Sequence, residues 1–129
     1  MIMQKNNLPK KYKEYFNQVF MLEVSEYFFD PVTAFKNVNK LLKKDGILWL
    51  SAHFIYPVHN PVEFDSIRYT PAGVEKLLKE TGFEVVDMKP RLANEVELLN
   101  LWQNQEKMRP AKLYNRHNWV GVLVKCKKI

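Results

Sequence analysis

The sequence holds one cysteine, Cys126, among 129 residues. A lone cysteine excludes an intrachain disulfide, so we expect a reducing, cytoplasmic compartment. Long hydrophobic runs are missing too, because the longest, from Ile47 to Tyr56, is interrupted by Ser51 and His53 and is far too short to span a bilayer. The first residues, MIMQKNNLPKK, lack the apolar core of a signal peptide. No membrane partner is therefore expected.

Glycine is scarce as well. The four glycines, Gly46, Gly73, Gly82 and Gly121, lie too far apart to form a glycine-rich nucleotide-binding turn. No internal repeat or low-complexity tract divides the chain, and its length suits one domain, 1–129.

The composition favours a folded, basic domain. Hydrophobic residues make up 47% and aromatic residues 13% of the chain, enough for a modest core. The formal net charge of +6 is spread along the sequence. The basic residues are densest in one cluster: Lys107, Arg109, Lys112 and Arg116. This cluster can contact phosphates, or it can simply keep a loop soluble. No nucleic-acid-binding motif accompanies it, so nucleic acid is not an expected partner.

The stretch from Asp30 to Phe54 predicts a helix followed by a buried strand. Asp30 can cap the helix and Pro31 suits its first position. Apolar residues then recur at spacings of three and four: Ala34, Phe35, Val38, Leu41 and Leu42. Gly46 is expected to end the helix in the left-handed conformation. The strand from Ile47 to Leu50 is apolar on both faces, which is typical of a sheet covered on both sides.

Similar signals predict the remaining elements. They are a lead-in with at most one helical turn up to Tyr15, a strand from Phe16 to Leu22, a loop or short helix from Glu23 to Phe29, a helix from Thr70-Pro71 to Gly82, a strand from Phe83 to Met88 halted by Pro90, a helix from Glu95 to about Lys107, and a strand from Trp119 to Cys126. The order β-α-β-α-β-α-β predicts an α/β fold whose sheet is mostly parallel, with an antiparallel last strand.

Five segments in this order resemble the second half of class I S-adenosylmethionine-dependent methyltransferases: FNQVFML, EYFFDP, LLKKDG, ILWLSAHF and RYTPAGVEKLLKETGFEVV. The resemblance covers Phe16 to Val86 well and the last strand loosely. Asn17, Tyr27 and Asp45 depart from it, since the family often has Asp, His and Gly there. It implies a partial Rossmann-like sheet, S-adenosylmethionine as cofactor and methyl transfer to an unknown acceptor. The family's N-terminal glycine-rich cofactor-binding half is absent from these residues.

Half of such a sheet is expected to need a partner. Right-handed crossovers place the first two helices on one face, which leaves an apolar face open and the first strand at an edge. That face can be covered by the helix from Glu95 to Lys107, by a second copy of the chain, or by another polypeptide that supplies the missing half. We predict a homodimer through that face or edge, with pairing to a separate cofactor-binding chain as the other option. The lone chain is expected to be inactive or weakly active. The competing hypothesis is a non-catalytic interaction domain.

Candidate catalytic and substrate-binding residues follow the second predicted strand. His53 and His59 can act as general bases because imidazole titrates near neutrality. Asp65, Arg68 and Tyr69 are candidates for substrate binding, since the resemblance places this loop over the substrate pocket and Arg68 can clamp a carboxylate or phosphate. In the alternative, Asp65 and Arg68 pair with each other and only fix the loop.

Candidate cofactor contacts end the first predicted strand. The resemblance implies that Met21, Leu22 and Glu23 line the methionine side of the cofactor, where Glu23 and Glu26 can approach its amino group. Alternatively, this segment is a solvated loop before the Asp30 cap. A metal held by His53, His59 and Asp65 would match no compact metal motif, so no metal is predicted.

Overall fold

The computed structural model describes residues 8–92 and 119–129. Its strands and helices, in chain order, are η2 (Lys10–Tyr12), β1 (Phe16–Met21), η3 (Ser25–Tyr27), α1 (Pro31–Leu41), β2 (Leu42–His53), α2 (Pro71–Glu80), β3 (Phe83–Leu92) and β4 (Trp119–Lys128). The predicted helix from Glu95 to Lys107 and the basic cluster around Arg109 lie outside these residues. None of the helices described is long and apolar enough to cross a membrane.

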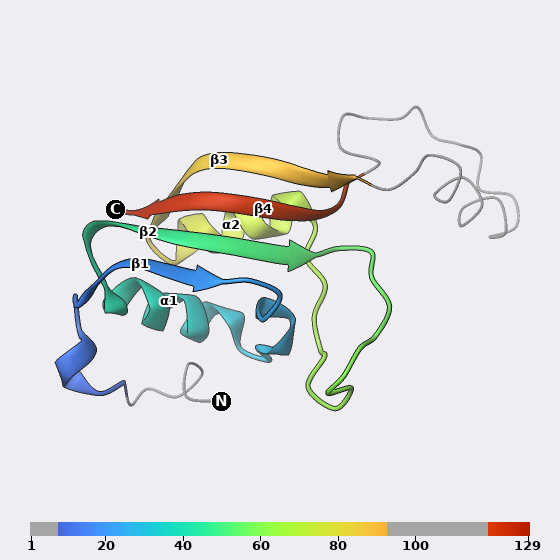
Figure 1. The fold of residues 1–129 in the computed structure, drawn as a ribbon, viewed down its shortest axis with the longest axis horizontal. Coiled ribbons are helices and arrows are strands. Elements are labelled where there is room, and N and C mark those ends of the chain that lie inside the picture. Colours follow the sequence, from blue (N-terminus) through green and yellow to red (C-terminus); the bar gives the residue numbers. More distant parts are fainter. Residues whose placement is uncertain (1–7, 93–118) are drawn as a thin grey trace, which may run out of the picture.

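The four strands form one mixed sheet in the order β1-β2-β4-β3 (Figure 1). β1 pairs with β2 in parallel, and β4 runs antiparallel between β2 and β3. Three strands therefore share one direction and the last opposes them. The predicted α/β class and the antiparallel last strand are confirmed. Because β4 is antiparallel to both of its neighbours, β2 and β3 point in the same direction, and their carboxyl ends lie at the same end of the sheet.

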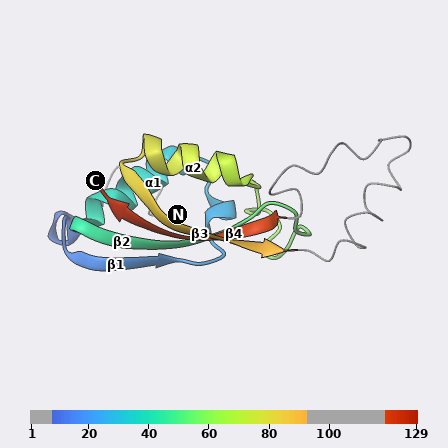
Figure 2. The same cartoon turned by 90° about the horizontal axis from the view of Figure 1, so that it is seen from above.

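Both long helices begin with the predicted cap-then-proline signal. The Asp30 carboxylate accepts a hydrogen bond from the Thr33 N–H at 3.1 Å, and the Thr70 hydroxyl accepts one from the Gly73 N–H at 3.0 Å. Figure 2 shows α1 and α2 on the same side of the sheet. Their apolar stripes bury the facing side chains of β2 and β4, chiefly Leu48, Leu50, Val122 and Val124. The expectation that both crossovers cover one face is confirmed.

The opposite face of the sheet has no helix over it among the described residues (Figure 2). Phe20 of β1 is 63% exposed there and stacks on Trp49 of β2, with ring centroids 6.3 Å apart. Lys125 of β4 lies over the same indole at 5.3 Å. We call Phe20, Ile47, Trp49 and Leu123 the open-face patch. It is less uniformly apolar than the sequence suggested, because lysines of β4 border it.

Several element ends differ from the sequence predictions: β2 already begins at Leu42 and β4 runs on to Lys128, and the expected stops at Gly46 and Pro90 act differently. Gly46 does not end α1 in the left-handed conformation; α1 stops at Leu41, and the positive φ of 61° belongs to Asp45. Gly46 is required for space, since a Cβ there would lie 2.8 Å from the Lys43 carbonyl oxygen. Pro90 does not halt β3, which continues to Leu92. β3 is an edge strand, and one side of such a strand needs no N–H donors.

Candidate functional site

Polar side chains gather where β1, β2 and β3 end. In open α/β sheets, ligands bind at the carboxyl ends of the parallel strands. Glu23 follows β1, Ser51 and His53 end β2, and Arg91 lies near the end of β3. The segment η3 and the loop between β2 and α2 add the other members of the site: Glu26, His59, Asp65 and Arg68.

Asp65 and Arg68 form a buried ion pair. The Arg68 guanidinium donates to both carboxylate oxygens of Asp65, at 2.7 Å for the Nη2–Oδ2 bond, and the His59 N–H donates to the same carboxylate at 2.9 Å. These hydrogen bonds, the one from Arg68 foremost, hold the pKa of Asp65 well below its usual range. Arg68 also donates to backbone carbonyls of the loop, at Tyr56, Pro57 and Ile67. The ion pair and these hydrogen bonds fix the loop, as the alternative interpretation of the sequence expected.

Glu23 is the most accessible carboxylate of the site. Its Oε1 accepts hydrogen bonds from the Ser51 hydroxyl at 2.7 Å and from Arg91 at 3.0 Å, and its other oxygen contacts Nε2 of His53. Partial burial by itself raises the pKa of Glu23, but the Ser51 hydrogen bond and the charges of His53 and Arg91 outweigh it, so the pKa is lowered. Glu23 therefore stays ionised at neutral pH and already binds one cationic group, the half-exposed Arg91 guanidinium, which a cationic ligand would replace.

His53 is enclosed on several sides. It is only 3% exposed, and the Tyr56 ring stacks on it with centroids 4.1 Å apart. Nη1 of Arg91 lies 3.1 Å from Nδ1 of His53. Since arginine can only donate, Nδ1 accepts this bond and the neutral ring carries its proton on Nε2, facing Glu23.

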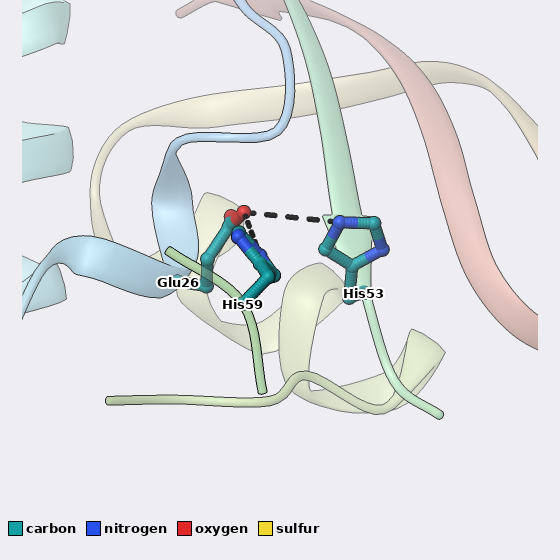
Figure 3. Close-up of side chains that lie close together, drawn as sticks. All are labelled: Glu26, His53 and His59. Atoms are coloured by element: carbon teal, nitrogen blue, oxygen red, sulfur yellow. Dashed lines mark ion pairs between the residues drawn. The ribbon is translucent and has the colours of Figure 1, made fainter. Parts of the chain in front are cut away.

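Glu26 and His59 lie beside His53, as Figure 3 shows. Glu26 is fully buried on η3, and its Oε1 is 3.2 Å from Nε2 of His59 and 3.8 Å from Nε2 of His53. Neither carboxylate oxygen of Glu26 accepts a hydrogen bond from any residue in the described part of the chain. Nδ1 of His59 lies 2.9 Å from the Tyr27 hydroxyl. Three elements thus converge on one buried carboxylate.

The remaining predicted site residues are placed less favourably for a ligand. Met21 is buried in the core on the helix side of the sheet, and Leu22 is half exposed. Tyr69 is buried, and its hydroxyl donates to the Ser25 carbonyl at 3.0 Å; burial raises the pKa of this phenol. The structure therefore brings Glu23, His53 and His59 together and leaves Met21 and Tyr69 in supporting positions.

Two residues of the site were not predicted from the sequence. Ser51 was masked by the apolar strand around it, although a hydroxyl in such a strand is a signal for a buried hydrogen bond. Arg91 follows Pro90, at which the sequence predicted the end of β3. The antiparallel pairing with β4 places Arg91 opposite Gly121 and near His53. No pattern within its own segment reveals that contact.

Comparison with known proteins identifies the fold. No protein-family model and no curated protein matches the chain. Solved structures do. A methyltransferase from Mesorhizobium loti matches with a TM-score of 0.62 and 12% identity over 98% of this chain and 66% of that one. One from Thermotoga maritima matches with a TM-score of 0.59 and 20% identity, over 95% and 60%. A third, from Haloferax volcanii in complex with its activator Trm112, matches with a TM-score of 0.60 and 13% identity, over 95% and 57%.

The first two of these proteins are S-adenosylmethionine-dependent enzymes by description. The chain spans between 57% and 66% of the length of these three proteins. It therefore has the fold of S-adenosylmethionine-dependent methyltransferases over part of their length.

Proposed function

We propose that this chain supplies part of the active site of an S-adenosylmethionine-dependent methyltransferase. The fold supports this proposal, and so does the position of Glu23, an ionised carboxylate at the carboxyl end of β1. That edge of an open α/β sheet is where ligands bind. Glu23 carries the proposal because its charge suits the amino group of the cofactor.

The roles of the other residues follow from their positions. His53 or His59 takes the proton of the methyl acceptor after the group beside its basic nitrogen has moved away, which is Arg91 at Nδ1 of His53 and Glu26 at Nε2 of His59. The loop fixed by Asp65 and Arg68 covers the acceptor. Catalysis then rests mainly on holding the methyl donor and the acceptor in line and excluding water. The 129 residues contain no glycine-rich turn, so the adenosine side of the cofactor site needs another chain segment.

Calorimetric titration of S-adenosylmethionine tests this proposal. We expect weak, saturable binding to the chain alone, with a Kd of about 1 mM, and tighter binding when a second chain provides a glycine-rich turn. Glu23→Gln should remove the binding, whereas Glu84→Gln, on the exposed part of β3, should keep it. Absence of heat at millimolar cofactor, with and without the second chain, would refute methyl transfer.

A second function, as an interaction domain, is favoured by the open-face patch. Aromatic and aliphatic side chains at its centre and lysines at its rim resemble the anatomy of a protein–protein interface. Contiguous exposed apolar surface of this kind often marks a binding site. We propose that a second copy of the chain covers it, which gives a homodimer; a separate cofactor-binding chain is the other occupant.

Sedimentation at micromolar concentration tests the homodimer. Phe20→Glu should shift the protein to monomer, because Phe20 is the most exposed side chain of the open-face patch, at 63%, and lies on the edge strand β1. Phe29→Glu is the matched control, since Phe29 is 83% exposed between η3 and α1, away from the sheet. A wild-type protein that sediments only as a monomer contradicts the homodimer.

A further inference from the structure

The buried carboxylate of Glu26 is the most unusual group in the described part of the chain. Its side chain has no exposed surface and accepts no hydrogen bond there. A buried charge without compensation costs several kcal/mol, so such groups are paired or bind metal ions. The neighbouring carboxylates are compensated: Asp65 by Arg68 and Glu23 by Arg91. Glu26 has no arginine or lysine of its own at ion-pair distance among the described residues, and the basic groups beside it are the imidazoles of His59 and His53.

The hydrogen bonds of His59 direct a lone pair towards Glu26. The Tyr27 hydroxyl donates to the Asn60 carbonyl at 2.9 Å, so it accepts from Nδ1 of His59 at the same distance. In the neutral ring the proton is then on Nδ1 and Nε2 carries the lone pair. Nε2 is buried and lies 3.2 Å from Oε1 of Glu26, without the geometry of a hydrogen bond. Two lone pairs that face each other repel, and either a proton or a metal ion between them removes the repulsion; only a metal ion can bind His53 at the same time.

We propose that Glu26, His53 and His59 bind a divalent transition-metal ion. One carboxylate and two imidazoles are a common ligand set for zinc, and they also suit non-haem iron. The three ligand atoms lie within 4.8 Å of one another. Two ligands of a tetrahedral zinc ion, each at about 2.05 Å, are roughly 3.3 Å apart, close to the 3.2 Å between Glu26 and His59. The other separations, 3.8 Å between Glu26 and His53 and at most 4.8 Å within the set, must shorten when the ion binds.

The surrounding structure already holds these ligands. The backbone N–H groups of Ser66 and Ile67 donate to the Glu26 carbonyl at 3.0 and 3.2 Å, which ties the loop to η3. The Tyr27 hydroxyl orients His59, as outer-shell partners do at metal sites. The site differs from the one considered in the sequence, because Asp65 is occupied by Arg68 and Glu26 replaces it.

His53 can bind the metal ion only after its ring proton has moved from Nε2 to Nδ1. Its Nε2–H now faces Glu23, and Arg91 lies against Nδ1. Metal binding moves the proton to Nδ1 and displaces Arg91, whose side chain is half exposed and free to move into solvent. The three protein ligands leave a coordination position for Glu23 or for an acceptor atom. A histidine bound through Nε2 cannot be a base there, so a bound metal would take over the role proposed for the histidines.

Metal binding can be measured without any methyltransferase assay, so its failure and that of the proposed function are distinguishable. Chelator-treated protein is titrated with Zn²⁺ by calorimetry, and with Co²⁺ to record its visible absorption spectrum. We expect one equivalent to bind with a Kd of about 1 μM or tighter. The Co²⁺ spectrum should be intense, as expected for a four- or five-coordinate ion.

Three variants and a control locate the site. Glu26→Gln and His59→Ala should each weaken Zn²⁺ binding about 100-fold, whereas Glu84→Gln should leave it unchanged. Arg91→Ala should tighten binding about tenfold, because it removes a positive charge beside the ion. This opposite sign separates loss of a ligand from general damage to the fold. No binding to wild-type protein below 1 mM, or equal binding by wild type, Glu26→Gln and His59→Ala, would overturn the proposal.

Discussion

Arg68→Ala is expected to be among the most destabilising single substitutions in the loop between β2 and α2. The substitution leaves the Asp65 carboxylate, whose side chain has no exposed surface, without its cation. Breaking a buried ion pair costs roughly 3–5 kcal/mol. Arg68 is itself 23% exposed, so water can partly replace it and the lower end of that range, about 3 kcal/mol, applies. For a chain of this size the melting temperature should fall by about 10 °C.

Urea unfolding followed by circular dichroism measures this loss. Lys89→Ala is the control, because Lys89 pairs with Asp87 on the exposed side of β3 and should change the free energy of unfolding by less than about 0.5 kcal/mol. Adding Asp65→Asn to Arg68→Ala should restore part of the stability, since no buried charge is then left uncompensated. An Arg68→Ala variant within about 1 kcal/mol of wild type would refute this reasoning.

The same pair gives a pH dependence whose sign is fixed. The folded-state pKa of Asp65 is depressed below its ordinary value of 3.8 by the hydrogen bonds from Arg68. The unfolded state therefore binds the proton first, and stability from this group is present above that value and is lost as the pH falls below it. The difference in unfolding free energy between wild type and Arg68→Ala should shrink between pH 6 and pH 3. A difference that grows with acidity contradicts the assignment.

Three further predictions concern the packing of the helices against the sheet. Gly82→Ala should cost about 1–2 kcal/mol in urea unfolding, because Gly82 has a φ of 85° and a Cβ there would lie 2.9 Å from Nδ2 of Asn39; an unchanged midpoint would contradict this. Thr70→Ala should cost about 1 kcal/mol through loss of the α2 cap, and equal stability would show that the cap is dispensable. Burial raises the pKa of Cys126 to about 12, so its thiol should resist labelling at pH 8 until urea unfolds the chain, and rapid labelling of native protein would exclude the buried position.

Much of the fold could be predicted from local patterns. Asp30-Pro31 and Thr70-Pro71 start the two long helices because a capping oxygen followed by a proline satisfies the first turn wherever it occurs. Apolar neighbours from Ile47 to Leu50 made β2 a central strand, since side chains alternate between faces. Handedness then put both helices on one face. These features depend on residues close together in the sequence and on the right-handed crossovers that L-amino acids favour.

The candidate site could be predicted only in part. The sequence pointed to Glu23, His53 and His59 because they follow strands, but it could not show that Glu26 would be buried between the histidines. Asp65 and Arg68, candidates for a ligand, turned out to bind each other. Which charges meet depends on how the loop folds back on η3, and no spacing in the chain records that.

Among the residues that the structure describes, the sequence by itself determined the two long helices, the four strands, their order and the placement of both helices on one face of the sheet. Only the tertiary structure decided that β4 inserts between β2 and β3, which brings Arg91 to His53. It also decided that Glu26 is sealed from water beside two imidazoles. The physical reason is range: caps, turns and alternation act over a few residues, whereas burial and charge pairing join groups tens of residues apart.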